Sequence, residues 1–224
     1  MTAALEGSPV RGEVGDGEPT GAGRPRRPTR DERARRQDNR RRQLLDAAAR
    51  LFREHGFDAA SMRHIAAAVG MLPGSVYYHF ESKDELLAAV YDEGIRQVSE
   101  AVEAAVAEAV GPWARLEAAC AAHLEALLGD RDYAAVVIGI FPRVSESLRA
   151  RLAARRDEYE QIFRDLVEAL PLDRARDRHY LRLGLLGSLN WAETWYRPDG
   201  DRPADIARAF VGLLRRRLDP EAQP

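Results

Sequence analysis

The side chains best suited to chemistry in this sequence lie close together between residues 61 and 83. The hydroxyls of Ser75, Tyr77 and Tyr78 and the imidazole of His79 fall within five positions, and Lys83 follows them. Hydroxyl and cationic groups bond phosphate oxygens, and hydroxyls also reach the edges of bases. This combination indicates contact with a nucleic acid more than it indicates catalysis.

Enzyme motifs are missing from the sequence. It contains no G-x-S-x-G nucleophile motif, P-loop, H-E-x-x-H pair or dinucleotide fingerprint. Cys120 is the only cysteine and has no obvious partner base, and no further ligand stands at metal spacing from His64 or His79. We therefore expect no catalytic residue, metal or cofactor, and we interpret both histidines as hydrogen-bonding surface residues.

The element that must position these side chains is a helix-turn-helix. Ser61 can cap a helix of about two turns, Gly70 ends it, and Pro73 stands at the first position of another very short helix. Helices of this length are marginal alone, so they must pack on the amphipathic helix that begins at Asp38. The last helix of such a unit enters the major groove of DNA, and Gly74 permits close approach of its backbone.

The remainder of the chain keeps helical spacing, and no stretch alternates like a strand. We expect an all-α protein of about nine helices, in which an N-terminal helix-turn-helix precedes a C-terminal helical domain. The expected divisions are a disordered basic arm over 1–37, the DNA-binding domain over 38–83, the C-terminal domain over 84–219 and a tail over 220–224. The longest apolar run, residues 134–141, is too short to span a bilayer.

The overall charge of −2 hides an asymmetry along the chain. Residues 24–42 carry ten arginines and three acids, a net charge of +7, whereas residues 84–224 carry 19 basic and 25 acidic residues, a net charge of −6. A basic head on an acidic body predicts phosphate binding at one end. We expect the basic arm to add salt-dependent affinity through the DNA backbone or minor groove, although such a segment can also be a solubilising tail.

The stretch AARLFREHGFDAASMRHIAAAVGMLPGSVYYHFESKDELLAAVYD resembles the DNA-binding domain of the tetracycline-repressor (TetR) family. The resemblance implies phosphate contact by Tyr77, Tyr78 and Lys83 and by the start of the second helix near Ser61. It implies base reading near Met62, Arg63 and Ser75. One departure is that many members carry Ser or Thr as the cap of the third helix, where Leu72 stands here. The expected DNA-binding residues are Ser61, Met62, Arg63, Gly74, Ser75, Tyr77, Tyr78, His79 and Lys83.

The resemblance also implies a homodimer built from the last two long helices. Leucines recur at i, i+4 and i+8 near residue 185, and small residues four apart would let two helices approach closely. The alternative is that these stripes form only the core of one chain, but a two-fold operator needs a dimer. The expected interface residues are Leu181, Gly184, Leu185, Ser188, Leu189, Phe210, Leu213 and Leu214.

The stretch GSLNWAETWYRPDGD, with an R-x-x-Y pair at 156–159, resembles the subgroup that regulates fatty-acid and sterol catabolism and responds to acyl-CoA thioesters. Such a ligand needs an apolar slot for its acyl group and cations for its phosphates. For each arginine the alternative is a solvated charged surface, and for each tryptophan a place in the core or interface. The expected ligand-binding residues are Phe141, Arg143, Arg156, Tyr159, Phe163, Asn190, Trp191, Trp195 and Arg197.

Together these patterns predict a transcriptional regulator, in particular a repressor that a small molecule, such as an acyl-CoA thioester, releases from a palindromic operator in double-stranded DNA. The alternatives are a ligand-independent DNA-binding or architectural protein and a transcriptional activator. The single cysteine and the lack of a secretory signal are typical of a cytoplasmic protein, here one associated with the nucleoid and without a membrane partner.

Overall fold

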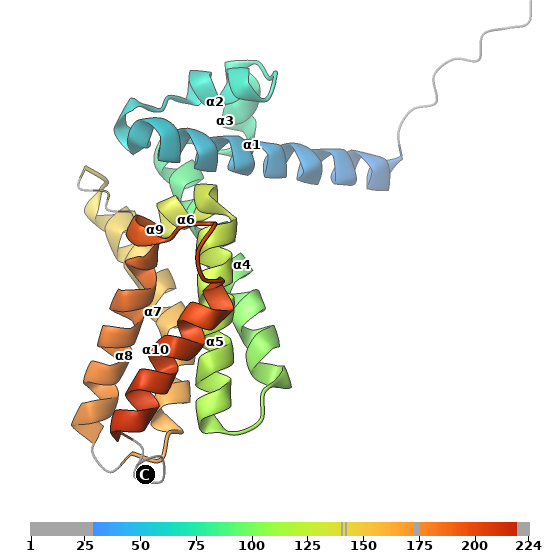
Figure 1. The fold of residues 1–224 in the computed structure, drawn as a ribbon. Coiled ribbons are helices and arrows are strands. Elements are labelled where there is room, and N and C mark those ends of the chain that lie inside the picture. Colours follow the sequence, from blue (N-terminus) through green and yellow to red (C-terminus); the bar gives the residue numbers. More distant parts are fainter. Residues whose placement is uncertain (1–28, 140, 142, 173–174, 219–224) are drawn as a thin grey trace, which may run out of the picture.

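The computed structural model describes residues 29–139, 141, 143–172 and 175–218, with the side chains of residues 33–34 and 175–177 left aside. Over this part of the chain the regular structure is entirely helical, which confirms the expected all-α fold (Figure 1). The helix α9 is a single turn directly after α8, so the pattern agrees with the expected number of about nine. The helices are α1 (Arg30–Ala59), α2 (Met62–Ala68), α3 (Pro73–His79), α4 (Lys83–Glu108), α5 (Pro112–Gly129), α6 (Arg131–Val137), α7 (Glu146–Glu168), α8 (Ala175–Asn190), α9 (Ala192–Trp195) and α10 (Pro203–Leu218).

Helix α1 begins earlier than the sequence predicted. The expected start was Asp38, but the hydroxyl of Thr29 accepts a hydrogen bond from the backbone N–H of Glu32 at 3.2 Å, and the Glu32 carboxylate accepts one from the Thr29 N–H at 2.8 Å. This capping box holds the first turn, so residues 30–37 are helical. Residues 1–28 of the predicted arm and the predicted tail over 220–224 lie outside the described residues.

Helices α1, α2 and α3 form a head whose inner faces are apolar. Ser61 caps α2, and Gly70 turns the chain after it at a φ of 65°, a conformation that glycine adopts without strain. Ile65 of α2 and Val76 of α3 are fully buried in the same core as Leu44 of α1. The two short helices are therefore stable because they pack on α1.

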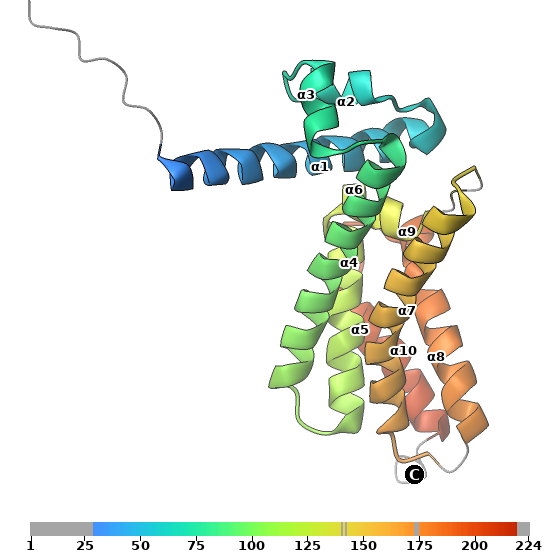
Figure 2. The ribbon, with the colours of Figure 1, turned by 180° about the vertical axis from the view of Figure 1, so that it is seen from behind.

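The body is a helical bundle that is connected to the head by α4 (Figures 1 and 2). Helix α5 packs between α4 and α10, and α7 packs on α4 and α8. The bundle centre is apolar, with Leu116, Leu124, Phe163 and Leu189 all fully buried. None of the described helices is both long and apolar enough to cross a membrane.

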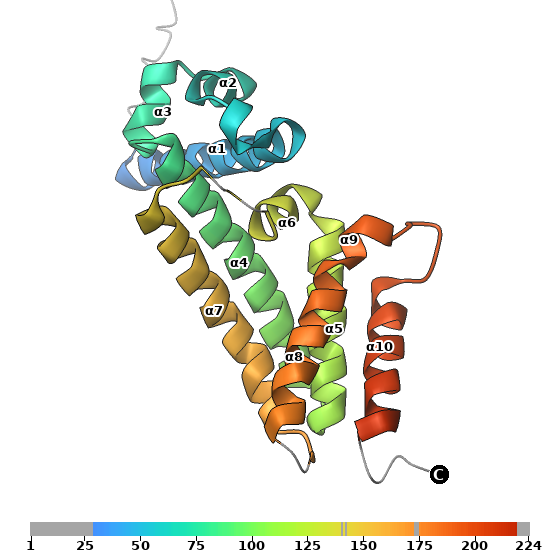
Figure 3. The same cartoon turned by 90° about the vertical axis from the view of Figure 1, so that its left-hand side faces the viewer.

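Helix α6 lies at the junction, in contact with α1 of the head and with α4 and α5 of the body (Figure 3). Gly94 of α4 allows this close packing, because a Cβ there would lie 2.7 Å from the Cγ2 of Val137 on α6. One short helix thus touches both parts of the molecule.

Candidate DNA-binding surface and ligand cavity

The outer surface of α3 presents the groups that the sequence singled out. The side chains of Tyr78 and Tyr77 are 79% and 52% exposed, while Val76, between them and the core, is fully buried. Ser75 is half-buried, and the space around Gly74 is open. The ring of His79 stands edge-to-face against Tyr78, with centroids 5.6 Å apart. This surface offers hydroxyl donors and acceptors on a helix, and the major groove of DNA is wide enough to admit a helix.

Helix α2 divides its predicted residues between surface and core. Arg63 is exposed, and the hydroxyl of Ser61 accepts a hydrogen bond from the backbone N–H of His64 at 3.2 Å. Met62 is only 6% exposed. The prediction that Met62 reads bases is therefore wrong, because its side chain points into the head as part of the apolar face that holds α2 on α1.

Lys83 also has a role that the sequence did not predict. Its ammonium donates hydrogen bonds to the backbone carbonyls of Phe57, Asp58 and Ala60 at 2.8, 3.2 and 2.9 Å, and it lies 4.4 Å from the centroid of the Phe57 ring. An ammonium has three donors, and all three are used here. This contradicts the predicted phosphate contact: Lys83 ties the start of α4 to the end of α1.

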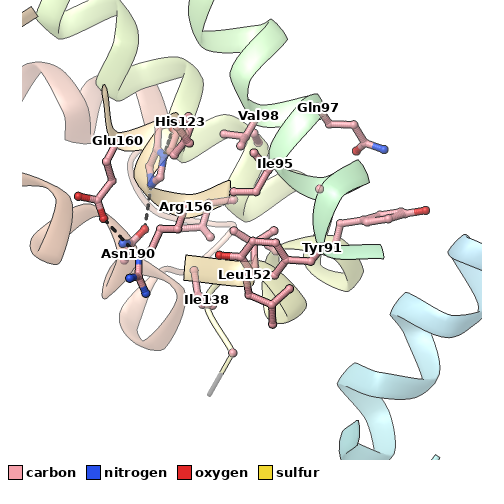
Figure 4. A pocket seen from close by; sticks show the side chains of 18 of the residues that line it. Tyr91, Ile95, Gln97, Val98, His123, Ile138, Leu152, Arg156, Glu160 and Asn190 are labelled. Atoms are coloured by element: carbon pink, nitrogen blue, oxygen red, sulfur yellow. Dashed lines mark hydrogen bonds and ion pairs between the residues drawn. The ribbon is translucent and has the colours of Figure 1, made fainter. Parts of the chain in front are cut away.

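A cavity of about 810 Å³ lies in the body between α4, α5, α6, α7 and α8 (Figure 4). Its walls are mainly apolar, with Ile95, Val98, Ile138 and Leu152 among the side chains that line it. Four of the predicted ligand residues line it, namely Phe141, Arg156, Tyr159 and Asn190. Volume and lining suit a small molecule with a sizeable apolar part.

The other predicted ligand residues lie elsewhere, which corrects five positions. Phe163 is fully buried behind the wall and contacts the ring of Tyr159. Arg143 points outward and pairs with Asp58 of the head at 3.3 Å. The three remaining side chains are exposed on the outside of the bundle. They come after the end of α8 and are not on its inner face: Trp191, Trp195 and Arg197.

A chain of three polar side chains crosses the mainly apolar wall. Nδ1 of His123 on α5 lies 2.6 Å from the hydroxyl of Tyr159 on α7, and its Nε2 lies 3.1 Å from Oδ1 of Asn190 on α8. Burial lowers the pKa of His123 to about 4 and raises that of Tyr159 well above its usual value. All three groups are therefore uncharged near neutral pH, and they match a neutral oxygen of a ligand better than a carboxylate.

Charged groups gather beside this polar chain on α7. Glu160 forms an ion pair with Arg182 of α8, and Nε of Arg156 lies 3.8 Å from the same carboxylate. Figure 4 shows Glu160 and Arg156 close to Asn190, on the side of the cavity away from Tyr91 and Ile95. Arg156 also lies 3.7 Å from Asp157. Because both of these contacts are long and Glu160 is already engaged by Arg182, Arg156 is able to bind an anionic group of a ligand.

The cavity is connected to the head through α6 and the segment after it. Tyr133 lines the cavity, and its hydroxyl donates a hydrogen bond to Asp46 of α1 at 2.8 Å. Phe141, also in the lining, contacts the ring of Phe57 at the end of α1 with centroids 6.0 Å apart. Any ligand that displaces these side chains acts on α1 through direct contacts.

A second connection joins α7 to α4. Asp92 of α4 accepts hydrogen bonds from Arg151 at 2.6 Å and Arg155 at 3.1 Å. The neighbouring residues Leu152 and Arg156 line the cavity. Helix α7 therefore forms part of the cavity wall and also makes ionic contacts with α4, the helix that leads from the head into the body.

Two segments of the chain match described protein families. Residues 44–90 match "Bacterial regulatory proteins, tetR family", and residues 109–218 match "Tetracyclin repressor-like, C-terminal domain". The HTH-type transcriptional repressor KstR2 of Rhodococcus jostii is 32% identical over 197 residues, which cover 83% of this chain and 92% of KstR2. The chain belongs to the TetR family. The predicted family and the expectation of a DNA-binding transcriptional regulator rather than an enzyme are thereby confirmed.

Two further proteins that resemble this TetR family member are named for an activator role and for a complex with a ligand and DNA. The HTH-type transcriptional activator FasR of Mycolicibacterium smegmatis is 31% identical over 189 residues, covering 80% of this chain and 81% of FasR. The crystal structure of AibR in complex with isovaleryl coenzyme A and operator DNA is 27% identical, covers 78% of this chain and 97% of AibR, and has a TM-score of 0.69. Both matches extend over head and body.

The predicted dimer residues of this TetR family member lie on two faces of α8 and on α10. Leu181, Leu185 and Leu189 are between 0% and 5% exposed, so the stripe that was assigned to the interface belongs to the core of the chain itself, as the alternative held. Gly184 and Ser188 are exposed on the other face, and nothing lies within 4 Å of a Cβ placed at Gly184. On α10, Leu213 is 59% exposed, while Phe210 and Leu214 are half-buried.

The most informative cavity residue of this TetR family member was missed by sequence reasoning. His123 stands in the apolar stripe of α5, where Leu116, Cys120, Leu124 and Leu127 are buried. A histidine in such a stripe needs hydrogen-bonding partners, and this was the available signal. Its partners lie 36 and 67 positions away, so the sequence did not identify them.

Proposed function

We propose that this protein is a homodimeric repressor that binds a palindromic operator in double-stranded DNA and leaves it when an acyl-CoA thioester enters the cavity. KstR2 is named as a repressor, and the AibR structure contains both isovaleryl coenzyme A and operator DNA. Since its target is chromosomal DNA, we place the protein in the cytoplasm at the nucleoid. The domain divisions at 83 and 219 belong to this proposal.

The observation that carries the proposal is the contact between the cavity wall and the head. The hydroxyl of Tyr133, a lining residue, donates to Asp46 of α1 at 2.8 Å. A ligand that prefers a displaced α6 weakens DNA binding by as much as its affinity differs between the two arrangements. A cavity of this kind without contact to the head would have no such effect.

On the DNA side, the exposed residues of α2 and α3 are the proposed contacts. Tyr77 and Tyr78 donate to phosphates, while Arg63 and Ser75 reach base edges. The N-terminal part of α2 at Ser61, the open backbone at Gly74 and the imidazole of His79 complete the surface. Met62 and Lys83 have no part in it, because one is in the core and the other is bound to α1.

On the ligand side, the cavity separates two kinds of interaction. The acyl group occupies the apolar part. In the chain of His123, Tyr159 and Asn190 the imidazole donates to Asn190 Oδ1 and accepts from the Tyr159 hydroxyl, so the amide N–H of Asn190 is the donor that bonds an uncharged oxygen such as a thioester carbonyl. Arg156 meets a phosphate of the coenzyme. A free acid lacks the phosphates that Arg156 is proposed to meet, and its carboxylate would lose solvation beside the neutral groups. We therefore expect thioesters to act and the corresponding free acids to fail.

The proposed dimer uses the outer face of α8 together with α10. Leu183 on α8, Trp191 directly after it and Leu213 on α10 are 45%, 66% and 59% exposed, and Gly184 lets a second helix come close. Exposed apolar groups of this size favour association. Two heads held about 34–36 Å apart would fit successive major grooves.

The test is an electrophoretic mobility shift with DNA from upstream of the protein's own gene, repeated with acyl-CoA thioesters and their free acids. We expect a shift on a palindromic site that a thioester reverses and its acid does not. Arg156→Gln should weaken the response, and Arg164→Gln, on the same helix outside the cavity lining, should not. A specific shift that no thioester reverses would contradict the ligand, and no specific shift on any upstream fragment would contradict autoregulation by repression.

A second candidate is transcriptional activation, which the similarity to the activator FasR favours. The head and the cavity would serve an activator equally well, because the position of the operator decides the sign of regulation. In vitro transcription from the bound promoter separates the two. A repressor lowers the transcript level until the thioester is added, and an activator raises it.

A further inference from the structure

The N-terminal part of α1 carries charge that the head does not neutralise. Residues 30–43, which we call the helical arm, contain seven arginines and three acids, a net charge of +4. Two of the acids, Asp31 and Glu32, stand in the first turn, where Glu32 completes the capping box and both face the positive end of the helix. Beyond this turn the arm has one acid, Asp38, and is otherwise basic or uncharged.

The helical arm contributes no side chain to the core. Every residue of the arm whose exposure is described is exposed, and Leu44 is the first residue of α1 that is buried. Figures 1 and 2 show this half of α1 projecting sideways from the head with no other element beside it. Within the described part of the chain, Arg35, Arg36 and Arg40 have no ion-pair partner. A helix that is polar all round and capped at its start is suited to a partner outside the chain.

The C-terminal end of the helical arm lies next to the proposed DNA contacts. The guanidinium of Arg41 lies 5.2 Å from the ring centroid of Phe80, and Arg41 shares a groove with His79 at the end of α3. From there the arm extends across the long axis of the body, beside the layer of α2 and α3 (Figure 1). Its 14 residues span about 20 Å, which equals about six base pairs.

We propose that the helical arm binds phosphates of the DNA that flanks each operator half-site, beyond the base pairs that α2 and α3 contact. This inference rests on the proposed function, because it requires α3 to be seated on DNA. Arginine on an exposed helix binds phosphate oxygens without reading sequence. The arm therefore increases the affinity, the salt dependence and the length of DNA covered, and leaves the sequence preference to α2 and α3.

The test compares the full chain with two triple variants on three fluorescently labelled duplexes. The first variant carries Arg35→Gln, Arg36→Gln and Arg40→Gln in the arm. The matched control carries Arg115→Gln, Arg164→Gln and Arg217→Gln, on helix ends opposite the head (Figure 1). The first duplex contains only the palindrome identified in the mobility-shift experiment. The second adds about eight unrelated base pairs on each side of it, and the third is an unrelated duplex of the same length as the second. Affinities are measured by anisotropy over a series of salt concentrations.

The expected result is a loss of salt dependence in the arm variant alone. The slope of log affinity against log salt should fall by about 0.9 for each arginine that touches a phosphate, hence by roughly 1–3 per protomer on the long palindrome. The flanking base pairs should tighten binding by the wild-type chain and by the control, but not by the arm variant. Circular dichroism and gel filtration should be alike for all three proteins, since glutamine favours helix and the arm is outside the core.

Equal slopes for the arm variant and the wild type, or an equal gain from the flanks, would overturn the proposal. A change of oligomeric state in the arm variant would overturn it too, because the arm would then bind a second copy of the chain. The unrelated duplex distinguishes this proposal from the proposed function. If no palindrome is recognised, a difference in slope on that duplex still supports phosphate binding by the arm, and the absence of a difference rejects it.

Discussion

The head and the body of this protein place their functional residues at very different spacings along the chain. Apart from the helical arm, the proposed DNA contacts of the head lie between Ser61 and His79, on or at the start of two helices of seven residues each. In the body, His123 meets partners that are 36 and 67 positions distant, on two other helices. A short motif is enough to build a surface, whereas a cavity needs a bundle that brings remote segments together.

The two regions also differ in how they treat polar groups. The head exposes its hydroxyls and arginines to solvent, where a phosphate can replace water at little cost. The body buries His123 and Tyr159 among apolar side chains, where each group depends on a hydrogen-bonding partner. Changes in the body should therefore act mainly on stability and ligand response, and changes on the outer surface of the head mainly on DNA affinity.

The largest expected effect concerns the pH dependence of the body. The pKa of His123 is about 4 in the folded chain and about 6.5 when unfolded, so between these values the unfolded chain takes up a proton that the folded chain does not. Its contribution to stability is complete above pH 6.5 and is lost as the pH falls toward 4, by roughly 3 kcal/mol. Urea unfolding at a series of pH values should show this loss in the wild type and not in His123→Phe.

The control for this prediction is His55→Gln, since the side chain of His55 is 56% exposed. That variant should keep the pH dependence of the wild type. If His123→Phe loses stability between pH 6.5 and 4 as steeply as the wild type, the histidine is not held neutral and the contrast between the two regions fails.

The next effect tests the inner side of the head. Lys83→Met removes the ammonium that bonds three carbonyls at the end of α1, and we expect the free energy of unfolding to fall by about 2 kcal/mol. The salt dependence of DNA binding should stay the same. A variant with wild-type stability and a slope lower by about 0.9 would instead return Lys83 to the phosphate contact implied by its motif.

Lys83 illustrates what the sequence could and could not predict. The motif around it placed the helices of the head, the cap at Ser61 and the exposed tyrosines, because each depends on residues within a few positions. The partners of the lysine are backbone carbonyls more than 20 positions earlier, and no local pattern indicates them. The same limit applies in the cavity. Tyr159 was predicted there from a local pattern, but its hydrogen-bonding partner His123 was not, because the two residues are 36 positions apart.

The outer surface of the head should respond with affinity and not with stability. Tyr78→Phe removes one exposed hydroxyl, and we expect about tenfold weaker binding to the palindrome with an unchanged unfolding midpoint. Tyr196→Phe, on the half-buried tyrosine after α9, serves as the matched change in the body. Anisotropy titrations that give the same affinity for Tyr78→Phe and wild type would remove this hydroxyl from the DNA contacts.

The smallest expected effect concerns the cap of α3. Leu72 occupies the N-cap position without a side-chain hydrogen bond and is 77% exposed. Leu72→Ser should raise the free energy of unfolding by about 0.5–1 kcal/mol, because a hydroxyl there can accept from the first free N–H groups. Leu72→Ala provides the uncapped reference. Equal stability of the Ser and Ala variants would show that Pro73 already fixes this turn.

The coupling between cavity and head is tested most directly by its reciprocity. The affinity of the palindrome is measured with and without the thioester that reverses the shift, and the affinity of that thioester is measured with and without the palindrome. Linkage requires the two ratios to be equal, and we predict a common factor above about fivefold that becomes smaller in Tyr133→Phe, which lacks the hydrogen bond to Asp46. A thioester that binds the cavity equally well with and without DNA would contradict the account.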